Sequence, residues 1–240
     1  MFIVALFVYC MHMIVLLLFG ELLFLYLLAA RLTQAIYDLT MLLTRSRAVA
    51  VTVVTLLAFP GTVIHELSHL FTAEVLGVRT GKLTLVPESI REEEVKTGSV
   101  MIAATDPFRR YTIGLAPVFA GLMAITALSY LLSLSTTYDL LSIFYFYLLF
   151  AVSNSMFSSR EDLKGFIPFI LTLTILIAAA YIAGIRVGLT GPILAFVIKI
   201  LDALTKSLGV VLALNIIGLL LVNALIAATA RLTHRTLHRT

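Results

Sequence analysis

Two histidines and a glutamate stand close together in the stretch PGTVIHELSHL, residues 60–70. His65 and His69 are four residues apart, so on a helix they share one face and their ring nitrogens can bind the same metal ion. Glu66 follows the first histidine and can reach a water molecule on that metal as a general base. The motif therefore predicts a Zn²⁺ site for hydrolysis, with His65 and His69 as ligands and Glu66 as the catalytic residue.

The composition around this motif is that of a membrane protein. The 240-residue chain is 61% hydrophobic and 12% charged, whereas a soluble domain is about 25% charged. Ionisable side chains at membrane depth are costly, and they normally face a cavity, a partner or an ion. A bound metal ion would explain why three such residues occur in one of the most apolar segments.

Charge and cysteine content exclude several other classes of protein. The net charge of +4 is small and spread along the chain, so it does not indicate nucleic-acid binding. The single cysteine, Cys10, cannot form an internal disulfide. The N-terminal run lacks a positively charged start and stays apolar for about 30 residues, which favours a retained transmembrane helix over a signal peptide. No feature of the sequence indicates an oligomeric state.

We expect an all-α integral membrane protein: a bundle of about six transmembrane helices forming a single polytopic domain over residues 1–240. A spanning helix needs about 20 apolar residues, and six stretches are predicted to span: Met1–Ala30, Ala48–Leu76, Tyr111–Leu134, Tyr138–Phe157, Gly165–Ile185 and Ser207–Ala230. The polar stretch 77–110 has two β-leaning pieces around an acidic turn, which predicts a small β-hairpin after the second helix. Leu189–Leu204 contains Lys199 and Asp202 and is predicted to be an interfacial helix.

The lysines and arginines are distributed unevenly between the two sides of this six-span arrangement. Of the 17 basic residues, 11 lie on the side of the hairpin and the C-terminal tail, and six lie on the other side. Because cytoplasmic loops carry an excess of lysine and arginine, the hairpin and the active-site side are predicted to be cytoplasmic. We expect a multi-pass protein of the plasma membrane, in contact with the lipid bilayer.

Three segments between about residues 48 and 170 resemble the site-2 protease family of intramembrane zinc metalloproteases. FPGTVIHELSHLFTAEVLGVRTGKLTLVP (59–87) is similar to the family's motif helix and following hairpin, YTIGLAPVFAGL (111–122) to its next helix, and NSMFSSREDLKG (154–165) to its Asn…Asp-Gly motif. The family's prolines between Asn154 and Asp162 are absent, and Gly165 follows Asp162 by three residues instead of one. The resemblance implies a catalytic core at about 48–170 that cleaves transmembrane or membrane-anchored proteins.

A catalytic zinc takes three protein ligands, so the two histidines need a third partner. The resemblance implies Asp162 as this ligand and Asn154 as a substrate-binding residue. In the six-span arrangement Asp162 ends the fourth span on the same side as His69, whereas the other acids near later spans are opposite the hairpin or in a turn: Asp139, Asp202 and Asp106. Asp162 could instead pair with Arg160 or Lys164, leaving Asp106 or Asn154 as the alternative ligand. Asn154 could instead form an interhelical polar contact.

Two other functions remain compatible with the motif. A zinc protease that cuts at the membrane surface would use a glutamate as its third ligand, but no transmembrane glutamate follows Glu74. A non-catalytic scaffold or a transporter could retain the motif, although the intact Glu66 argues against an inactive enzyme. The leading prediction is an intramembrane zinc metalloprotease.

Overall fold

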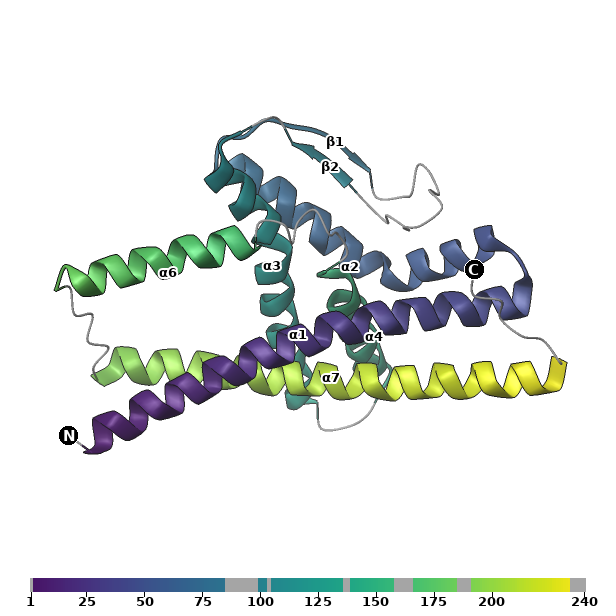
Figure 1. Cartoon of the computed structure of the whole chain (residues 1–240). Coiled ribbons are helices and arrows are strands. Elements are labelled where there is room, and N and C mark those ends of the chain that lie inside the picture. The colour runs from purple at the N-terminus through teal and green to yellow at the C-terminus, as the bar shows by residue number, and fades with distance from the viewer. Residues whose placement is uncertain are drawn as a thin grey trace.

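The computed structural model describes residues 2–84, 99–102, 105–135, 139–157, 166–184 and 191–233. Within these ranges the chain forms six helices and two short strands (Figure 1): α1 (Phe2–Thr44), α2 (Arg47–Val75), β1 (Thr80–Thr84), β2 (Ser99–Ile102), α3 (Pro107–Leu134), α4 (Leu140–Ser155), α6 (Phe166–Ile182) and α7 (Gly191–Thr233). Each predicted span overlaps one of these helices.

Four of the described helices are long and apolar enough to cross a membrane. These segments are Leu16–Thr44, Arg47–Val75, Pro107–Leu134 and Gly191–Leu232. The α4 helix has 16 residues and α6 has 17, both below the length of about 20 that a full crossing needs. The helices are therefore compatible with a multi-pass membrane protein, whereas the count of six spans is not confirmed.

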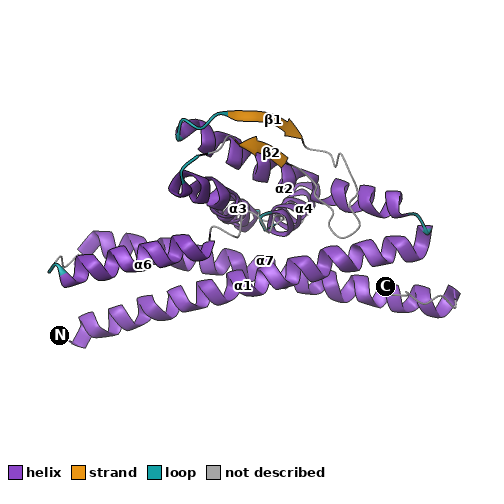
Figure 2. Ribbon diagram, turned by 45° about the horizontal axis from the view of Figure 1, so that its top comes forward, coloured by secondary structure: helices purple, strands orange, loops and turns teal. Residues whose placement is uncertain are grey.

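The two longest helices, α1 and α7, lie side by side and run in the same direction (Figures 1 and 2). Leu25 of α1 packs in one cluster with Leu208 and Val211 of α7. Further along both helices, the side chain of Leu32 lies 3.5 Å from the position that a Cβ on Gly218 would take. Consecutive spans alternate in direction, so six spans would place the first and the sixth antiparallel. The parallel pairing differs from that arrangement.

Helix α7 continues without interruption from Gly191 to Thr233, so residues 191–204 of the predicted interfacial segment 189–204 form its first part and not a separate helix. The interfacial position of this part stays a prediction. Of the two charged residues that suggested a break, Asp202 pairs within the helix: Lys206 Nζ lies 2.6 Å from Asp202 Oδ2, one turn earlier. Pairs at this spacing support a helix. Gly209 does not interrupt it either. Similarly, α1 continues past Ala30, the end of the predicted first span, as far as Thr44.

Helices α2, α3 and α4 form a second group, packed against the α1–α7 pair (Figure 2). Each begins at a side-chain cap that accepts a backbone N–H of its first turn: Ser46 for α2, Asp106 for α3 and Asp139 for α4. The bonds from the Ser142 backbone and hydroxyl hold the pKa of the Asp139 carboxyl below its ordinary value. These caps define where the three helices around the motif start.

The core joins the two groups of helices. Its buried residues come from α1, α3, α4 and α7, together with Met156 just after α4: Leu25, Ile125, Leu149, Val152, Met156, Leu208 and Val211. Ile64, next to the motif on α2, packs against this cluster. The motif helix is therefore anchored to the centre of the protein.

A glycine brings α2 and α4 unusually close together. A Cβ on Gly61 would lie 2.1 Å from the backbone oxygen of Ala151, a distance that no side chain could tolerate. The Ser155 hydroxyl of α4 donates to the Ala58 carbonyl at 3.2 Å in the same contact. This close approach lies one turn before His65 and fixes α4 against the motif helix.

The strands β1 and β2 pair antiparallel, with Leu83 opposite Val100 and Thr84 opposite Ser99. They fold back over α2, on the far side from the α1–α7 pair (Figure 2). The acidic turn predicted between them falls at residues 85–98, outside the described residues. The complete hairpin therefore stays a prediction.

Candidate metal centre

The motif residues lie in the interior on α2. His65, Glu66 and His69 are 3%, 4% and 5% exposed. The Nε2 atoms of the two histidines are 3.2 Å apart, and the rings meet edge to face with centroids separated by 4.8 Å. The α-helical spacing predicted that these side chains would share a face, and the structure brings their Nε2 atoms together.

This separation fits a shared metal ion. Two nitrogens bound to one tetrahedral zinc at about 2.0–2.1 Å lie about 3.3 Å apart. The observed 3.2 Å between the Nε2 atoms is close to that spacing, and it is also the length of an N–H···N hydrogen bond between the two rings. The donor set is also suitable, because imidazole nitrogen is a common zinc ligand.

A hydrogen bond from the neighbouring helix fixes the orientation of His69. Its Nδ1 atom lies 2.8 Å from the backbone oxygen of Ile113 on α3. A carbonyl oxygen only accepts, so Nδ1 carries the proton and Nε2 of the neutral ring keeps its lone pair. That lone pair faces His65. Metal-binding histidines characteristically have such a second partner on their other nitrogen.

Sequence reasoning missed Ile113, because a backbone carbonyl carries no signature in its residue type. A partial signal does exist. Pro117 stands four residues after Ile113 and has no N–H, so the Ile113 carbonyl lacks its usual helical donor. The sequence can indicate that this carbonyl is open, but only the packing of α3 against α2 shows that His69 takes it.

The predicted third ligand, Asp162, lies outside the described residues. Within the described ranges, no third His, Cys, Asp or Glu joins the two histidines. The other acids considered after the motif are engaged elsewhere. Asp106 caps α3 and pairs with Arg109 at 3.2 Å, Asp139 caps α4, and Asp202 pairs with Lys206. Asp162 therefore stays the predicted ligand.

Asn154, the predicted substrate-binding residue, belongs to a polar cluster between α4 and α7. Its Nδ2 donates to Oδ1 of Asn215 at 2.7 Å and to the Phe150 carbonyl at 2.8 Å. The fully buried Asn215 in turn donates to the Ser153 hydroxyl and the Val211 carbonyl, each at 3.0 Å. This geometry corresponds to the interhelical contact considered as the alternative role of Asn154.

The cluster leaves one acceptor open. The Phe150 and Val211 carbonyls can only accept, so they determine which end of each asparagine amide is nitrogen. Oδ1 is then the opposite end of the Asn154 amide from the donating Nδ2. It is buried with no hydrogen-bond partner among the described residues. A role for Asn154 in binding substrate stays a prediction.

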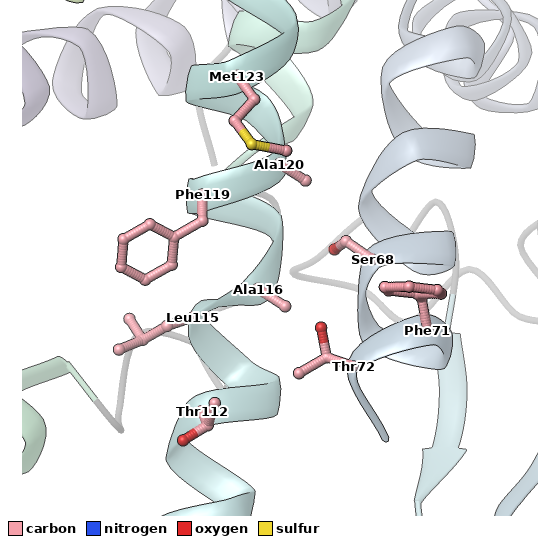
Figure 3. Close-up of a pocket in the computed structure, with 9 residues that line it drawn as sticks. All are labelled: Ser68, Phe71, Thr72, Thr112, Leu115, Ala116, Phe119, Ala120 and Met123. Atoms are coloured by element: carbon pink, nitrogen blue, oxygen red, sulfur yellow. The ribbon is translucent and has the colours of Figure 1, made fainter. Parts of the chain in front are cut away.

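An apolar groove of about 360 Å³ runs between α2 and α3 beside the motif (Figure 3). Ser68 and Thr72 of α2 face Ala116 and Ala120 of α3 across it (Figure 3). Aromatic and long side chains flank these small residues, and the complete lining is Ser68, Phe71, Thr72, Thr112, Leu115, Ala116, Phe119, Ala120 and Met123. The motif residues do not line this groove, although Ser68 and Thr112 are the sequence neighbours of His69 and Ile113.

Taken together, these features define a helical protein with membrane-spanning potential and a buried pair of histidines whose Nε2 atoms lie 3.2 Å apart. Comparison with protein-family models finds no match, and neither the curated proteins nor the solved structures provide one.

Proposed function

We propose that this protein is an intramembrane zinc metalloprotease that hydrolyses peptide bonds of transmembrane or membrane-anchored proteins. The observation that carries the proposal is the 3.2 Å separation of the two buried Nε2 atoms, with His69 Nδ1 bonded to the Ile113 carbonyl. The buried Glu66 beside them supplies a carboxylate. Together they form most of a hydrolytic metal site on an apolar helix.

Each residue has a defined task in this proposal. His65, His69 and Asp162 would hold zinc, which when bound polarises a carbonyl and makes water more acidic. Glu66 takes the proton of the attacking water and returns it to the leaving amine. The low exposure of all three motif residues keeps bulk water away from the reacting groups. Asn154 would bind substrate backbone through its open Oδ1.

The substrate and the orientation follow from the setting of the site. A protein whose helices are long and apolar enough to cross a bilayer meets substrates that are themselves in the membrane. Residues 77–110, which follow the motif helix, contain six of the 17 lysines and arginines. This excess supports a cytoplasmic position of the hairpin and the active-site side in the plasma membrane.

The test compares the wild-type chain with Glu66→Gln, both purified and reconstituted in lipid. We expect about one zinc per chain in each, because the substitution leaves both histidines in place. Cleavage of a reporter transmembrane helix should fall by a factor of about 10² to 10⁴ in the variant, the usual contribution of a general base. Cleavage near the wild-type rate would show that Glu66 is not the base.

Two other outcomes would favour the alternatives. Zinc binding without cleavage of any membrane-embedded reporter, combined with cleavage of a juxtamembrane one, would indicate a membrane-surface protease. A wild-type chain that binds no zinc would remove the metalloenzyme proposal and leave a scaffold or a transporter.

A further inference from the structure

Two prolines inside helices have the same arrangement around them. Pro60 in α2 stands four residues after Leu56, whose carbonyl accepts the Tyr147 hydroxyl of α4 at 3.4 Å. Pro117 in α3 stands four residues after Ile113, whose carbonyl accepts His69 Nδ1. Proline has no N–H, so it withdraws the donor that the carbonyl four residues earlier would normally use. In both places a side chain of a neighbouring helix replaces the missing donor.

The two replacements differ in what they accomplish. The Tyr147 bond joins α4 to α2 at Leu56, two turns before the motif. His69 is one of the two predicted ligands, and its bond to Ile113 decides which ring nitrogen carries the proton. Without an open carbonyl at Ile113, Nδ1 would have to compete with a backbone N–H for the same oxygen.

We propose that Pro117 is a positioning residue for the metal centre, because it keeps the Ile113 carbonyl free to hold the His69 ring with its Nε2 lone pair toward His65. Pro117 is fully buried, as is Ile113, and Ile113 packs with Ala73 of α2. Their contribution is to the orientation and the tautomer of His69, and Pro117 itself does not touch the metal. The inference rests on the proposed function as far as zinc is concerned.

The chain provides a matched control for the test. Pro117→Ala and Pro60→Ala each restore one N–H inside a helix, but only the first returns a competitor to the Ile113 carbonyl. Zinc affinity of the lipid-reconstituted protein is measured by competition with a chelator. Loss of such an outer partner typically weakens metal binding by about 10- to 100-fold. We expect a decrease of this size for Pro117→Ala and less than about 3-fold for Pro60→Ala.

A second readout does not need metal. Ring ¹⁵N chemical shifts of the metal-free, histidine-labelled protein report the tautomer of each histidine, with His69 assigned by comparison with His69→Ala. The wild type and Pro60→Ala should show His69 protonated on Nδ1, and Pro117→Ala should show a mixture. Because the site is fully buried, Pro117→Val serves as a second variant that supplies the N–H with a volume closer to that of proline.

These measurements distinguish the positioning role of Pro117 from the proposed protease function. Equal zinc affinity in Pro117→Ala, Pro117→Val and Pro60→Ala would overturn the positioning role while leaving the protease proposal intact. A wild-type spectrum without the Nδ1-protonated tautomer at His69 would also overturn it. If the wild-type chain binds no zinc, the proposed function fails, and the ring shifts alone then decide whether Pro117 sets the tautomer.

Discussion

The motif helix α2 and the long helix α7 are both apolar, but they differ in how much of each is covered by the rest of the protein. In its most apolar stretch, 39% of α2 is buried inside the protein, against 17% for α7. The ionisable groups follow the same division: the motif residues of α2 are enclosed, whereas the Asp202–Lys206 pair of α7 is exposed. An apolar sequence alone does not distinguish a helix with a largely exposed surface from one that encloses ionisable side chains.

The difference shows what a buried polar site requires of its neighbours. Desolvated ionisable groups are costly unless they are paired or bound to an ion. Helix α2 meets this requirement through α3, which supplies the Ile113 carbonyl, and through α4, which closes in at Gly61. The described part of α7 encloses no ionisable side chain, its buried Asn215 is a neutral amide, and the helix packs mainly along α1. The following predictions test this contrast.

The largest effect is expected at the predicted third ligand. Asp162→Ala should abolish both zinc binding and cleavage, because two histidines alone hold zinc far more weakly than three ligands do. Metal content after dialysis and cleavage of a transmembrane reporter measure the two losses. Full zinc occupancy in this variant would exclude Asp162 as a ligand.

Asp106→Ala and Glu74→Ala are the controls and should retain bound metal. Asp106 accepts the Arg109 backbone N–H at 3.0 Å as the cap of α3, so its loss should reduce stability by about 1 kcal/mol. Loss of zinc in Asp106→Ala with the fold retained would instead make Asp106 the ligand.

A smaller effect is expected from replacing one glycine by alanine in α2 and one in α7. Gly61→Ala places a Cβ 2.1 Å from the Ala151 oxygen and must push α4 away from α2, which should destabilise the protein by about 1–3 kcal/mol. Gly209→Ala has no atom within 4 Å of the new Cβ. It should stabilise α7 by up to about 1 kcal/mol through helix propensity alone. SDS titration of the detergent-solubilised variants gives both values, and equal shifts would contradict the contrast.

The smallest effect concerns the polar cluster of Ser153, Asn154 and Asn215, which links the two groups of helices. Asn215→Leu removes the acceptor for Asn154 Nδ2 and the donor to Ser153. We expect a loss of about 0.5–1.5 kcal/mol, in the range measured for hydrogen bonds between membrane helices. Asn223→Leu, the same change at an exposed position two turns further along α7, should be neutral within about 0.5 kcal/mol. The same titration compares them, and an effect of equal size at both positions would show that the cluster does not hold α4 to α7.

The sequence by itself determined the local features of this protein. Helical spacing places His65 and His69 on one face because four residues make about one turn, and the structure has them on one helix with their Nε2 atoms in contact. Apolar stretches predicted helices where α2, α3 and α4 lie. Each of these features depends on residues within a few turns of one another.

Only the tertiary structure decided which surfaces meet. The partner of His69 is a carbonyl 44 residues away, and the partner of Asn154 is 61 residues away. The parallel α1–α7 pair and the uninterrupted course of α7 also escaped prediction. Two physical reasons account for these differences. Charged residues within a helix can be satisfied by an i, i+4 pair, and an apolar face can pack on any complementary face. Periodicity therefore identifies which side of a helix is apolar, and packing alone selects its partner.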